Sequence, residues 1–512
     1  MTPLRLTEGH VAERHVAEAH VAGQRCAVLA LDQGSHASRA CIVDQDRTVL
    51  AEAQVPIRTV HGAGGEIEHD ADEIVASLRS AATSAIAQAR RRETGLIIST
   101  AGLATQRATL VCFDRRGGTP LSAAISWQDR RNAGWLASFA AHAERVRALT
   151  GLPLSPHYGV AKMRWCLQHL PAVQQAQRLG TLQIAPLSAW LVARLTGGAA
   201  RVDPSNASRT LLWDSSTHDW STELLGLFGV ELALLPVCSA TRADYGALRL
   251  GAAAADGIAL RAVTGDQAAI AFAFGAPDTR AIYINLGTGA FIQRPLTMRP
   301  ADPAPLLGSV LALEQGAMGT PGTAWYCLEG TVNGAGSAIE AFASQQRIDP
   351  AALWPQLEQL PDTRPLPLYV NGIGGLGSPY WRAAQPSYFI GEGSLLERFA
   401  AVVESIVVLL AINFDCMRCW GGAPERVLIS GGLSRSDWLC RRLAACLGVP
   451  VLRAAQEATV LGVAALATPH LPGAAASPLA PHRFEPQQFS ATARAELAAR
   501  RARLEHRLRE PA

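Results

Sequence analysis

The segment RAIYINLGTGAFIQR, residues 280–294, decides the fold. Apolar residues that suit a strand end at Asn285, a glycine turn follows at 286–289, and a second apolar run ends at Arg294. The same order of strand, polar glycine turn and strand occurs in CAVLALDQGSHASRACIV at residues 26–43. Two such hairpins, each opening one half of the chain, predict a duplicated α/β fold.

The duplication divides the chain into four parts. We expect a tail at residues 1–24, an N-terminal domain at 25–275, a C-terminal domain at 276–470, and a loop followed by a helix at 471–512. A nucleotide would bind in the cleft between the two domains, because ligand sites occur preferentially at domain interfaces. The tail carries a five-residue histidine repeat that spreads the rings around a helix, so it predicts no metal site.

Composition excludes several classes of protein. The 512 residues are 49% hydrophobic with a net charge of +3, which predicts a folded, soluble chain. The balance of 46 basic and 43 acidic residues gives no support to nucleic-acid or membrane binding, and the apolar run 406–412 is too short to span a bilayer. Ten cysteines are too sparse for a disulfide scaffold, and no secretory signal is evident, so we expect a cytoplasmic protein.

The chain contains one lysine, Lys162, which argues against two common phosphate-binding folds. A Walker loop ends in Gly-Lys-Ser/Thr, whereas Lys162 lies in the sequence VAKM, and the protein-kinase fold would lack its strand lysine. Cys416 and Cys419 form a CxxC pair, but no second pair completes a zinc site, and we interpret them as structural.

Other elements follow from hydrophobic spacing. Asp70 is expected to cap a helix whose apolar face extends to Ile86, and a second strand pair is expected at 96–99 and 109–113. A terminal helix is predicted at 491–509, and its many arginines are expected to be solvated rather than to form a binding patch.

Three glycine turns have the chemistry of a phosphate cradle. In DQGSH, residues 32–36, the glycine admits close backbone approach, Ser35 offers donors, and Asp32 at a strand end suits Mg²⁺ held through water. LGTGA at 286–290 offers similar donors, and ISGGLSRSD at 429–437 places glycines before a helix N-terminus. An ordinary turn is the alternative for each, but two turns at matching places of a repeat favour a shared role.

The candidate general base is Asp266, in VTGDQAA at residues 263–269. It lies where an apolar strand gives way to a helix of small residues, and the helix dipole would keep its carboxylate ionised. An ionised aspartate can accept the proton of a substrate hydroxyl during phosphoryl transfer. The alternative is a helix N-cap, and the two roles are compatible.

These motifs together resemble the FGGY carbohydrate kinases, and the glycerol kinases among them. The resemblance covers about residues 27–466 and rests on LDQG at 31–34, SWQDRR at 126–131, NASRT at 206–210, GDQ at 265–267, GTG at 287–289, LEG at 328–330 and GG at 431–432. It implies the duplicated actin/hexokinase-like (ribonuclease H-like) α/β fold, with two domains and an interdomain cleft.

The resemblance also implies an ATP-dependent kinase that phosphorylates a hydroxyl of a small polyol or sugar, with Mg²⁺ as cofactor. It implies that Asp266 is the general base and that Asp32 positions the metal. The implied substrate pocket comprises Arg107, Trp127, His157, Asp266, Gln267 and Phe291. The implied nucleotide and phosphate contacts are Ser35, His36, Arg39, Gly287, Thr288, Gly431, Gly432 and Ser436. A homo-oligomer, dimer or tetramer, is also expected.

The sequence departs from the family pattern around the acceptor. Gln106-Arg107 is followed by Ala108 where the glycerol kinases have Glu, and His157 replaces a tyrosine that contacts glycerol. His36 replaces a threonine of the first phosphate turn. Losing two specific acceptors favours a larger polyol or a ketose over glycerol. Glycerol kinase proper and a non-catalytic, ATP-binding actin-like regulator stay open as alternatives.

Overall fold

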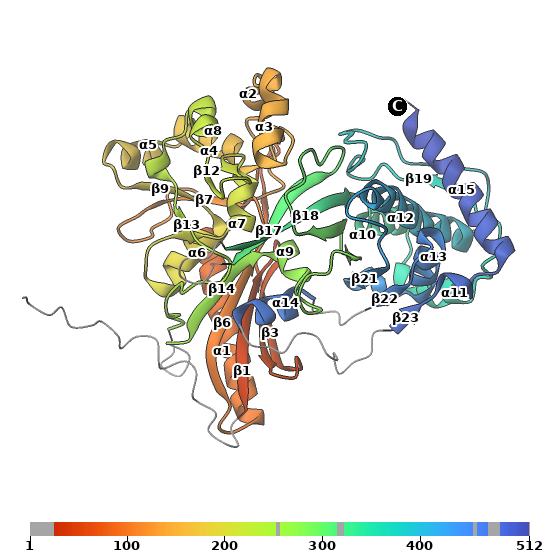
Figure 1. Ribbon diagram of the computed structural model, residues 1–512, viewed down its shortest axis with the longest axis horizontal. Helices are drawn as coiled ribbons and strands as arrows, with labels where there is room; N and C mark the ends of the chain where they lie inside the picture. The colour runs from red at the N-terminus through yellow and green to blue at the C-terminus, as the bar shows by residue number, and fades with distance from the viewer. Residues whose placement is uncertain (1–24, 252–256, 315–321, 454–457, 469–481, 511–512) are drawn as a thin grey trace, which may run out of the picture.

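The computed structural model describes residues 25–251, 257–314, 322–453, 458–468 and 482–510 (Figure 1). The histidine repeat of the tail lies outside these ranges, as does most of the loop expected after residue 470. Among the described residues, no helix combines the length and the apolar character needed to cross a bilayer.

The first hairpin forms the centre of a five-stranded sheet, here called the first sheet. Its strands, in spatial order, are β14 (Ala259–Gly265), β6 (Ile97–Thr105), β1 (Cys26–Gln33), β2 (Ala37–Asp44) and β3 (Val49–Pro56). β1, β2 and β3 are antiparallel neighbours, whereas β1, β6 and β14 run parallel.

Both faces of the first sheet are covered. Leu29 and Leu31 of β1 pack in the core that includes helix α1 (Ala71–Arg92), and Val28 and Ala30 pack in a second core with helix α14 (Ala458–Ala467). Alternate side chains of a strand point to opposite faces, so the continuous apolar run of β1 is explained by burial on both. Asp70 caps α1, accepting from Glu73 N at 2.9 Å, as the sequence predicts.

The second hairpin forms the centre of a seven-stranded sheet, the second sheet. Its strands, in spatial order, are β17 (Leu307–Glu314), β18 (Thr323–Val332), β16 (Ala290–Leu296), β15 (Ala281–Leu286), β21 (Arg426–Ser430), β22 (Val451–Arg453) and β23 (His482–Phe484). Five neighbouring strands of this sheet, in the spatial order β18-β16-β15-β21-β22, repeat the pairing directions of β3-β2-β1-β6-β14 in the first sheet. The predicted duplication is confirmed.

A smaller sheet lies beside the first one and carries the remaining helices of the N-terminal part. Its strands, in spatial order, are β4 (Val60–His61), β5 (Ile67–His69), β8 (Ala124–Ile125), β7 (Leu110–Asp114) and β9 (Leu182–Pro186). The expected strand pair at 96–99 and 109–113 is therefore wrong, because β6 and β7 belong to different sheets. Both edges of β6 are already occupied by β1 and β14, so β7 has no edge of β6 to join.

The other helices complete the layers. Around the smaller sheet and the junction lie α2 (Ala133–Ala137), α3 (Ala143–Thr150), α4 (Gly159–His169), α5 (Pro171–Arg178), α6 (Leu187–Thr196), α7 (Pro204–Ala207), α8 (Thr222–Phe228) and α9 (Asp266–Ile270). With the second sheet lie α10 (Gly336–Gln346), α11 (Trp354–Glu358), α12 (Leu395–Arg418), α13 (Asp437–Leu447) and α15 (Ala491–Arg509). Short ladders pair β10 (Arg201–Val202) with β13 (Val237–Cys238), β11 (Trp213–Asp214) with β12 (Asp219–Trp220), and β19 (Leu368–Val370) with β20 (Tyr388–Ile390).

Two elements join the parts of the molecule. Helix α14 comes late in the chain but packs on the first sheet, where a Cβ on Gly102 would lie 2.6 Å from Val463 and one on Gly462 would lie 1.9 Å from the carbonyl oxygen of Ala269. The hairpin of β17 and β18 reaches from the second sheet to the N-terminal part of the chain (Figure 1). There the backbone N of Gly308 donates to the carbonyl oxygen of Gly151, at the end of α3, at 2.9 Å.

The terminal helix has the predicted bounds but not the predicted surface. Arg500 is buried, and it donates to Glu404 of α12 at 2.7 and 2.9 Å. Leu497, Leu504 and Leu508 are buried along the same helix. The expectation that the arginines are all solvated is therefore wrong, because an apolar stripe fixes α15 against α12 and α13 and brings Arg500 with it.

Candidate functional site

The three parallel strands of the first sheet end together, and the candidate residues follow their ends. Asp32 of β1, Ala104 of β6 and Thr264 of β14 lie at one level of the sheet. The carboxyl ends of parallel strands are the usual ligand edge of an open α/β sheet. Asp32 and Thr264 are two strand spacings apart, about 10 Å. The first glycine turn, Arg107 and Asp266 therefore come to one edge.

Asp266 is the first residue of the five-residue helix α9, and Gly265 occupies the N-cap position. Its Oδ1 accepts from the backbone N of Gln267 at 2.7 Å, and its Oδ2 accepts from the side-chain Nε2 of the same residue at 3.4 Å. The side chain is 28% exposed. Burial raises the pKa of Asp266, with Arg107 acting in the opposite direction. A raised pKa makes the carboxylate a stronger base.

Arg107 lies between Asp266 and a carboxylate from the second sheet. Its Nη1 donates to Oε1 of Glu329 at 2.7 Å, and its Nη2 donates to Oε2 at 3.3 Å. Its Nε lies 3.9 Å from Oδ1 of Asp266, beyond hydrogen-bond distance. The methylene stem of Arg107 crosses Gly265, where an added Cβ would lie 2.5 Å from Cδ of the arginine. Glycine at 265 thus gives the arginine room to reach Glu329.

Glu329 of β18 also binds a second arginine. Arg209 donates to Oε2 of Glu329 and, at 2.5 Å, to Oγ of Ser309, and Gln293 donates to Oε1 of Glu329 at 3.2 Å. Burial would raise the pKa of Glu329, but the two guanidinium groups hold it well below its ordinary range. Arg209 and Glu329 lie in the segments NASRT and LEG, and no role was predicted for either residue. The sequence offered one signal for Glu329, because this charged residue directly follows the apolar run 324–328 of β18.

Ser35 and Trp127, predicted for phosphate and for substrate, lie together. The indole Nε1 of Trp127 donates to Oγ of Ser35 at 2.9 Å, and that hydroxyl donates to Oε1 of Gln106 at 3.3 Å. The same Oε1 of Gln106 also accepts a hydrogen bond from Oγ1 of Thr109 at 3.1 Å. That Oγ1 in turn accepts from the backbone N of Trp127 at 3.0 Å. This network fixes the first glycine turn against the SWQDRR segment.

His157 lies on the same side of the site. Its Nδ1 lies within hydrogen-bond distance of the carbonyl oxygen of Trp127, at 3.1 Å, and this contact orients the ring. Burial lowers the pKa of the His157 imidazole. Lys162 of α4 donates to the carbonyl oxygens of His157 and Ala108, at 2.5 and 3.0 Å. Ala108 has φ 62°, a left-handed conformation that is uncommon for a residue other than glycine. The single lysine thus joins the segments that contain Ala108 and His157.

The second glycine turn meets the third one. Gly431 has φ 90°, and a Cβ there would lie 2.4 Å from the carbonyl oxygen of Leu286, so this close approach needs glycine. Backbone N–H groups at the start of α10 donate to the carbonyls of Gly287 and Thr288, at 3.0 and 2.9 Å. Gly287, Thr288 and Gly432 are exposed. The two turns therefore lie in contact and expose backbone groups beside each other.

Four predicted residues have less direct placements. Ser436 is buried, caps α13, and donates to Oε1 of Glu358 at 2.8 Å, so its hydroxyl already has a structural partner. Arg39 pairs with Glu52 of the neighbouring strand at 2.6 Å. His36 is exposed at the tip of the first hairpin, and Phe291 is half-buried on β16, opposite Thr331 of β18.

A divalent cation would have few protein ligands here. Within the described ranges, no three His, Cys, Asp or Glu side chains gather as a possible metal cluster. Mg²⁺ commonly uses one or two carboxylates together with waters and substrate phosphates. Asp32, half-buried at the end of β1, fits that kind of site.

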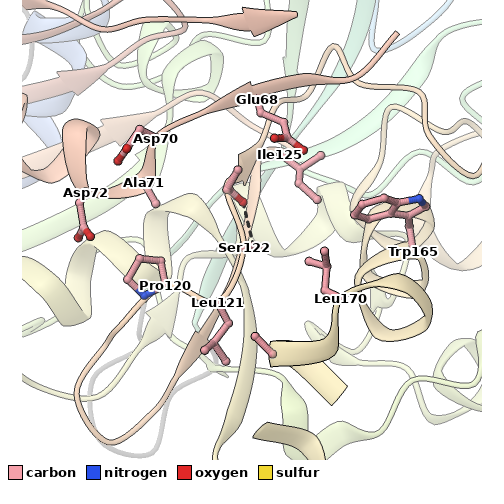
Figure 2. Close-up of a pocket in the computed structure, with 12 residues that line it drawn as sticks. Glu68, Asp70, Ala71, Asp72, Pro120, Leu121, Ser122, Ile125, Trp165 and Leu170 are labelled. Carbon is pink, nitrogen blue, oxygen red and sulfur yellow. Dashed lines mark hydrogen bonds between the residues drawn. The ribbon is translucent and has the colours of Figure 1, made fainter. Parts of the chain in front are cut away.

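A separate cavity of about 560 Å³ lies at the start of α1, lined by residues that include Glu68, Leu121 and Trp165 (Figure 2). Glu68 accepts from Arg131 at 2.7 Å, and that guanidinium lies over the Trp165 ring at 4.4 Å. None of the predicted site residues lines this cavity.

Comparisons with known proteins cover nearly the whole chain. The model of the FGGY family of carbohydrate kinases, N-terminal domain, matches residues 27–273, and that of the C-terminal domain matches 282–469. A glycerol kinase of Trichlorobacter lovleyi is 34% identical over 464 residues, covering 86% of this chain and 89% of that protein. A glycerol kinase of Alkalilimnicola ehrlichii is also 34% identical, over 463 residues with the same coverage.

Solved structures with this fold include kinases for different acceptors. Plasmodium falciparum glycerol kinase with ADP aligns with a TM-score of 0.82 at 21% identity, covering 96% of this chain and 99% of that one. A ligand-bound xylulose kinase from Lactobacillus acidophilus aligns with a TM-score of 0.77 at 18% identity, covering 94% and 97%. At these identities the likeness concerns the fold, which matches the predicted two-domain α/β architecture.

Proposed function

The chain belongs to the FGGY family of carbohydrate kinases, and we propose that it transfers the γ-phosphoryl group of ATP to a hydroxyl of a small polyol or sugar, with Asp266 as general base. Kinases of this family are phosphotransferases with an alcohol group as acceptor. The observation that carries the proposal is the placement of Asp266 beside Arg107, at the carboxyl ends of three parallel strands.

The reaction requires one proton transfer from the acceptor. As the acceptor oxygen bonds to the γ-phosphorus and the bond to the ADP oxygen breaks, the hydroxyl proton passes to Asp266. General-base catalysis of this kind contributes about 10²–10⁴ in rate. Burial raises the pKa of Asp266, which favours proton uptake, and Arg107 offers a positive group to the acceptor. Most of the remaining rate enhancement in phosphoryl transfer comes from positioning and charge stabilisation.

Asp266→Asn tests the role of the base. We expect kcat to fall by about 10²–10⁴, the usual value of a general base, while ATP binding is retained. Asp244→Asn serves as the control, because Asp244 is exposed and pairs with Arg261 at the surface. Near wild-type turnover in Asp266→Asn would remove the assignment.

ATP would be held by the two glycine turns of the second sheet and by the first hairpin. Gly287, Thr288 and Gly432 offer an exposed backbone, and Gly431 holds the turns together. Ser35, His36 and Arg39 of the first hairpin are the proposed phosphate contacts, and Ser436 would act through the α13 cap. Asp32 would hold Mg²⁺ largely through water, and the cation would neutralise phosphate charge during transfer.

The acceptor pocket is proposed to comprise Arg107, Trp127, His157, Gln267 and Phe291. Ala108 and His157 support a larger polyol or a ketose over glycerol, because they replace two side chains that would otherwise bind glycerol hydroxyls. The buried carbonyl oxygen Oε1 of Gln267 has no hydrogen-bond partner within the described structure, and it is available to an acceptor hydroxyl.

A panel of acceptors tests the substrate class. Turnover is measured with glycerol, erythritol, pentitols, xylulose and ribulose, and we expect kcat/KM to be highest for a substrate larger than glycerol. A preference for glycerol would instead favour glycerol kinase proper. ATP binding without turnover of any acceptor would favour the non-catalytic regulator. The expected dimer or tetramer is tested by light scattering on the same preparation.

A further inference from the structure

Glu329 has no role in the proposed chemistry, yet its carboxylate is the most heavily bonded one at the site. It lies on β18, it is 2% exposed, and both of its oxygens accept from guanidinium groups. Arg107 and Arg209 come from the region matched by the N-terminal family model, whereas Glu329 belongs to the C-terminal one. The cluster therefore joins the two regions at the edge where Asp266 lies.

The charges of this cluster balance in a specific way. Two arginines, 107 and 209, face two carboxylates, Glu329 and Asp266. Arg107 directs both terminal nitrogens to Glu329 at 2.7 and 3.3 Å, and its Nε stays 3.9 Å from Asp266. A guanidinium group donates best in a two-pronged arrangement to one carboxylate, and Glu329 is the carboxylate that receives it.

We propose that Glu329 is a positioning residue that holds the Arg107 guanidinium away from Asp266. Removing the Glu329 carboxylate would leave Asp266 as the nearest carboxylate to Arg107, and the guanidinium would turn to it. A direct ion pair would occupy an oxygen of the base that must accept the proton. It would also stabilise the ionised form and weaken the base.

Several charged or titratable groups face this arrangement. Arg107 and Glu329 act on Asp266, while Arg209, Cys327 and Tyr158 surround Glu329. Burial raises the pKa of both Cys327 and Tyr158, so they stay neutral near pH 7. The acidic side of the pH profile is therefore set mainly by Asp266, under the control of Arg107 and Glu329.

This inference rests on the proposed function, and Glu329→Gln tests it. The amide keeps the size of the side chain but removes its charge. We expect kcat/KM for the acceptor to fall at least tenfold, and the acidic limb of its pH profile to move to lower pH. A crystal structure of the variant should bring Arg107 Nε within hydrogen-bond distance of Asp266.

The matched control is Glu314→Gln. Glu314, on the neighbouring strand β17, pairs with Arg242 at 3.3 Å, also across the two regions, but it has no contact with Asp266 among the interactions described. Its pH profile should equal that of the wild type. Glu329→Asp keeps the charge, and we expect its acidic limb to stay close to the wild-type position.

Two further outcomes separate the possible failures. Should Glu329→Gln not fold, the double variant Glu329→Gln/Arg209→Met removes the unpaired buried cation and gives the same test. If a folded variant keeps both the wild-type acidic limb and the Arg107–Asp266 separation, the positioning role is overturned. A wild-type protein without turnover would contradict the proposed function, while the separation in the crystal structure would still decide the role of Glu329.

Discussion

The ammonium group of Lys162 donates to the carbonyl oxygen of Ala108 at 3.0 Å, and Ala108 is held in a left-handed conformation at φ 62°. The same ammonium donates to the carbonyl of His157. Lys162, from a buried position on α4, thereby fixes both of these segments of the proposed acceptor pocket. Two partly buried carbonyl groups therefore share one donor.

Replacing this lysine should therefore alter acceptor binding more than ATP binding. In Lys162→Met, the two carbonyls lose their donor, at a cost of about 1 kcal/mol each, the lower end for an unsatisfied group, because both are only partly buried. We expect the acceptor KM to rise at least tenfold, with a smaller change in the Kd for ATP. Steady-state kinetics and calorimetry measure both quantities. Equal losses for ATP and acceptor would instead indicate general damage to the fold.

The same residue predicts how stability depends on pH. Burial lowers the pKa of Lys162 to about 7, with Asp129 acting in the opposite direction, whereas an unfolded lysine titrates near 10.4. Between these values the unfolded chain binds the extra proton, so this group makes folding more favourable as pH rises, by up to about 1.4 kcal/mol per pH unit. Below about pH 7 both states are protonated, and the contribution no longer changes.

Denaturation of the wild type and Lys162→Met at pH 7, 8 and 9 measures this effect. The stability of the wild type relative to the variant should increase with pH across this range. Since Lys162 is the only lysine in the chain, no other lysine contributes to the difference. A difference that stays constant with pH would contradict the lowered pKa.

The contact between the second and third glycine turns gives a separate prediction. In Gly431→Ala, the new methyl would lie 2.4 Å from the carbonyl oxygen of Leu286, and φ 90° is itself unfavourable for alanine. The turns must move apart, and we expect ATP affinity to fall at least tenfold. Gly448→Ala is the matched control, because Gly448 also has positive φ but has no atom within 4 Å of the added Cβ. It should lose about 1 kcal/mol of stability and keep its ATP affinity.

Local patterns of the sequence predicted the two hairpins and the duplication. Strand and turn preferences act over a few residues. The hairpins β1–β2 and β15–β16 each consist of two apolar strands joined by a glycine turn, so they could be predicted from local sequence. The position of Asp266 at a strand end followed from the same kind of pattern. The resemblance to the family then supplied the proposed roles of these residues.

The contacts that organise the site had no such local signal. Glu329 lies 222 residues from Arg107 in the chain, and only the folded arrangement of β18 against the first part brings them together. The packing of α14 on the first sheet is equally non-local, as is the choice of which arginine of α15 is buried. Composition showed many arginines but could not identify the one that meets Glu404.

That buried arginine gives the last prediction. Glu404 of α12 accepts from Arg500 at 2.7 and 2.9 Å and from Arg442 at 3.2 Å, and the side chains of Arg500 and Glu404 are each 6% exposed. Arg500→Met leaves a buried carboxylate with one partner fewer, and breaking such a pair typically costs about 3–5 kcal/mol.

Arg507→Met on the same helix is the control. Arg507 pairs with Glu510 at 3.0 Å at the surface, and an exposed pair is worth about 0–1 kcal/mol. We expect Arg500→Met to lower the denaturation midpoint clearly and Arg507→Met to leave it nearly unchanged, as measured by chemical denaturation. Because α15 packs on α12 and α13, away from the ends of β1, β6 and β14, kcat at low temperature should stay near wild type in both variants. Equal stability of the two variants would show that the Arg500–Glu404 pair does not fasten α15 to the second sheet.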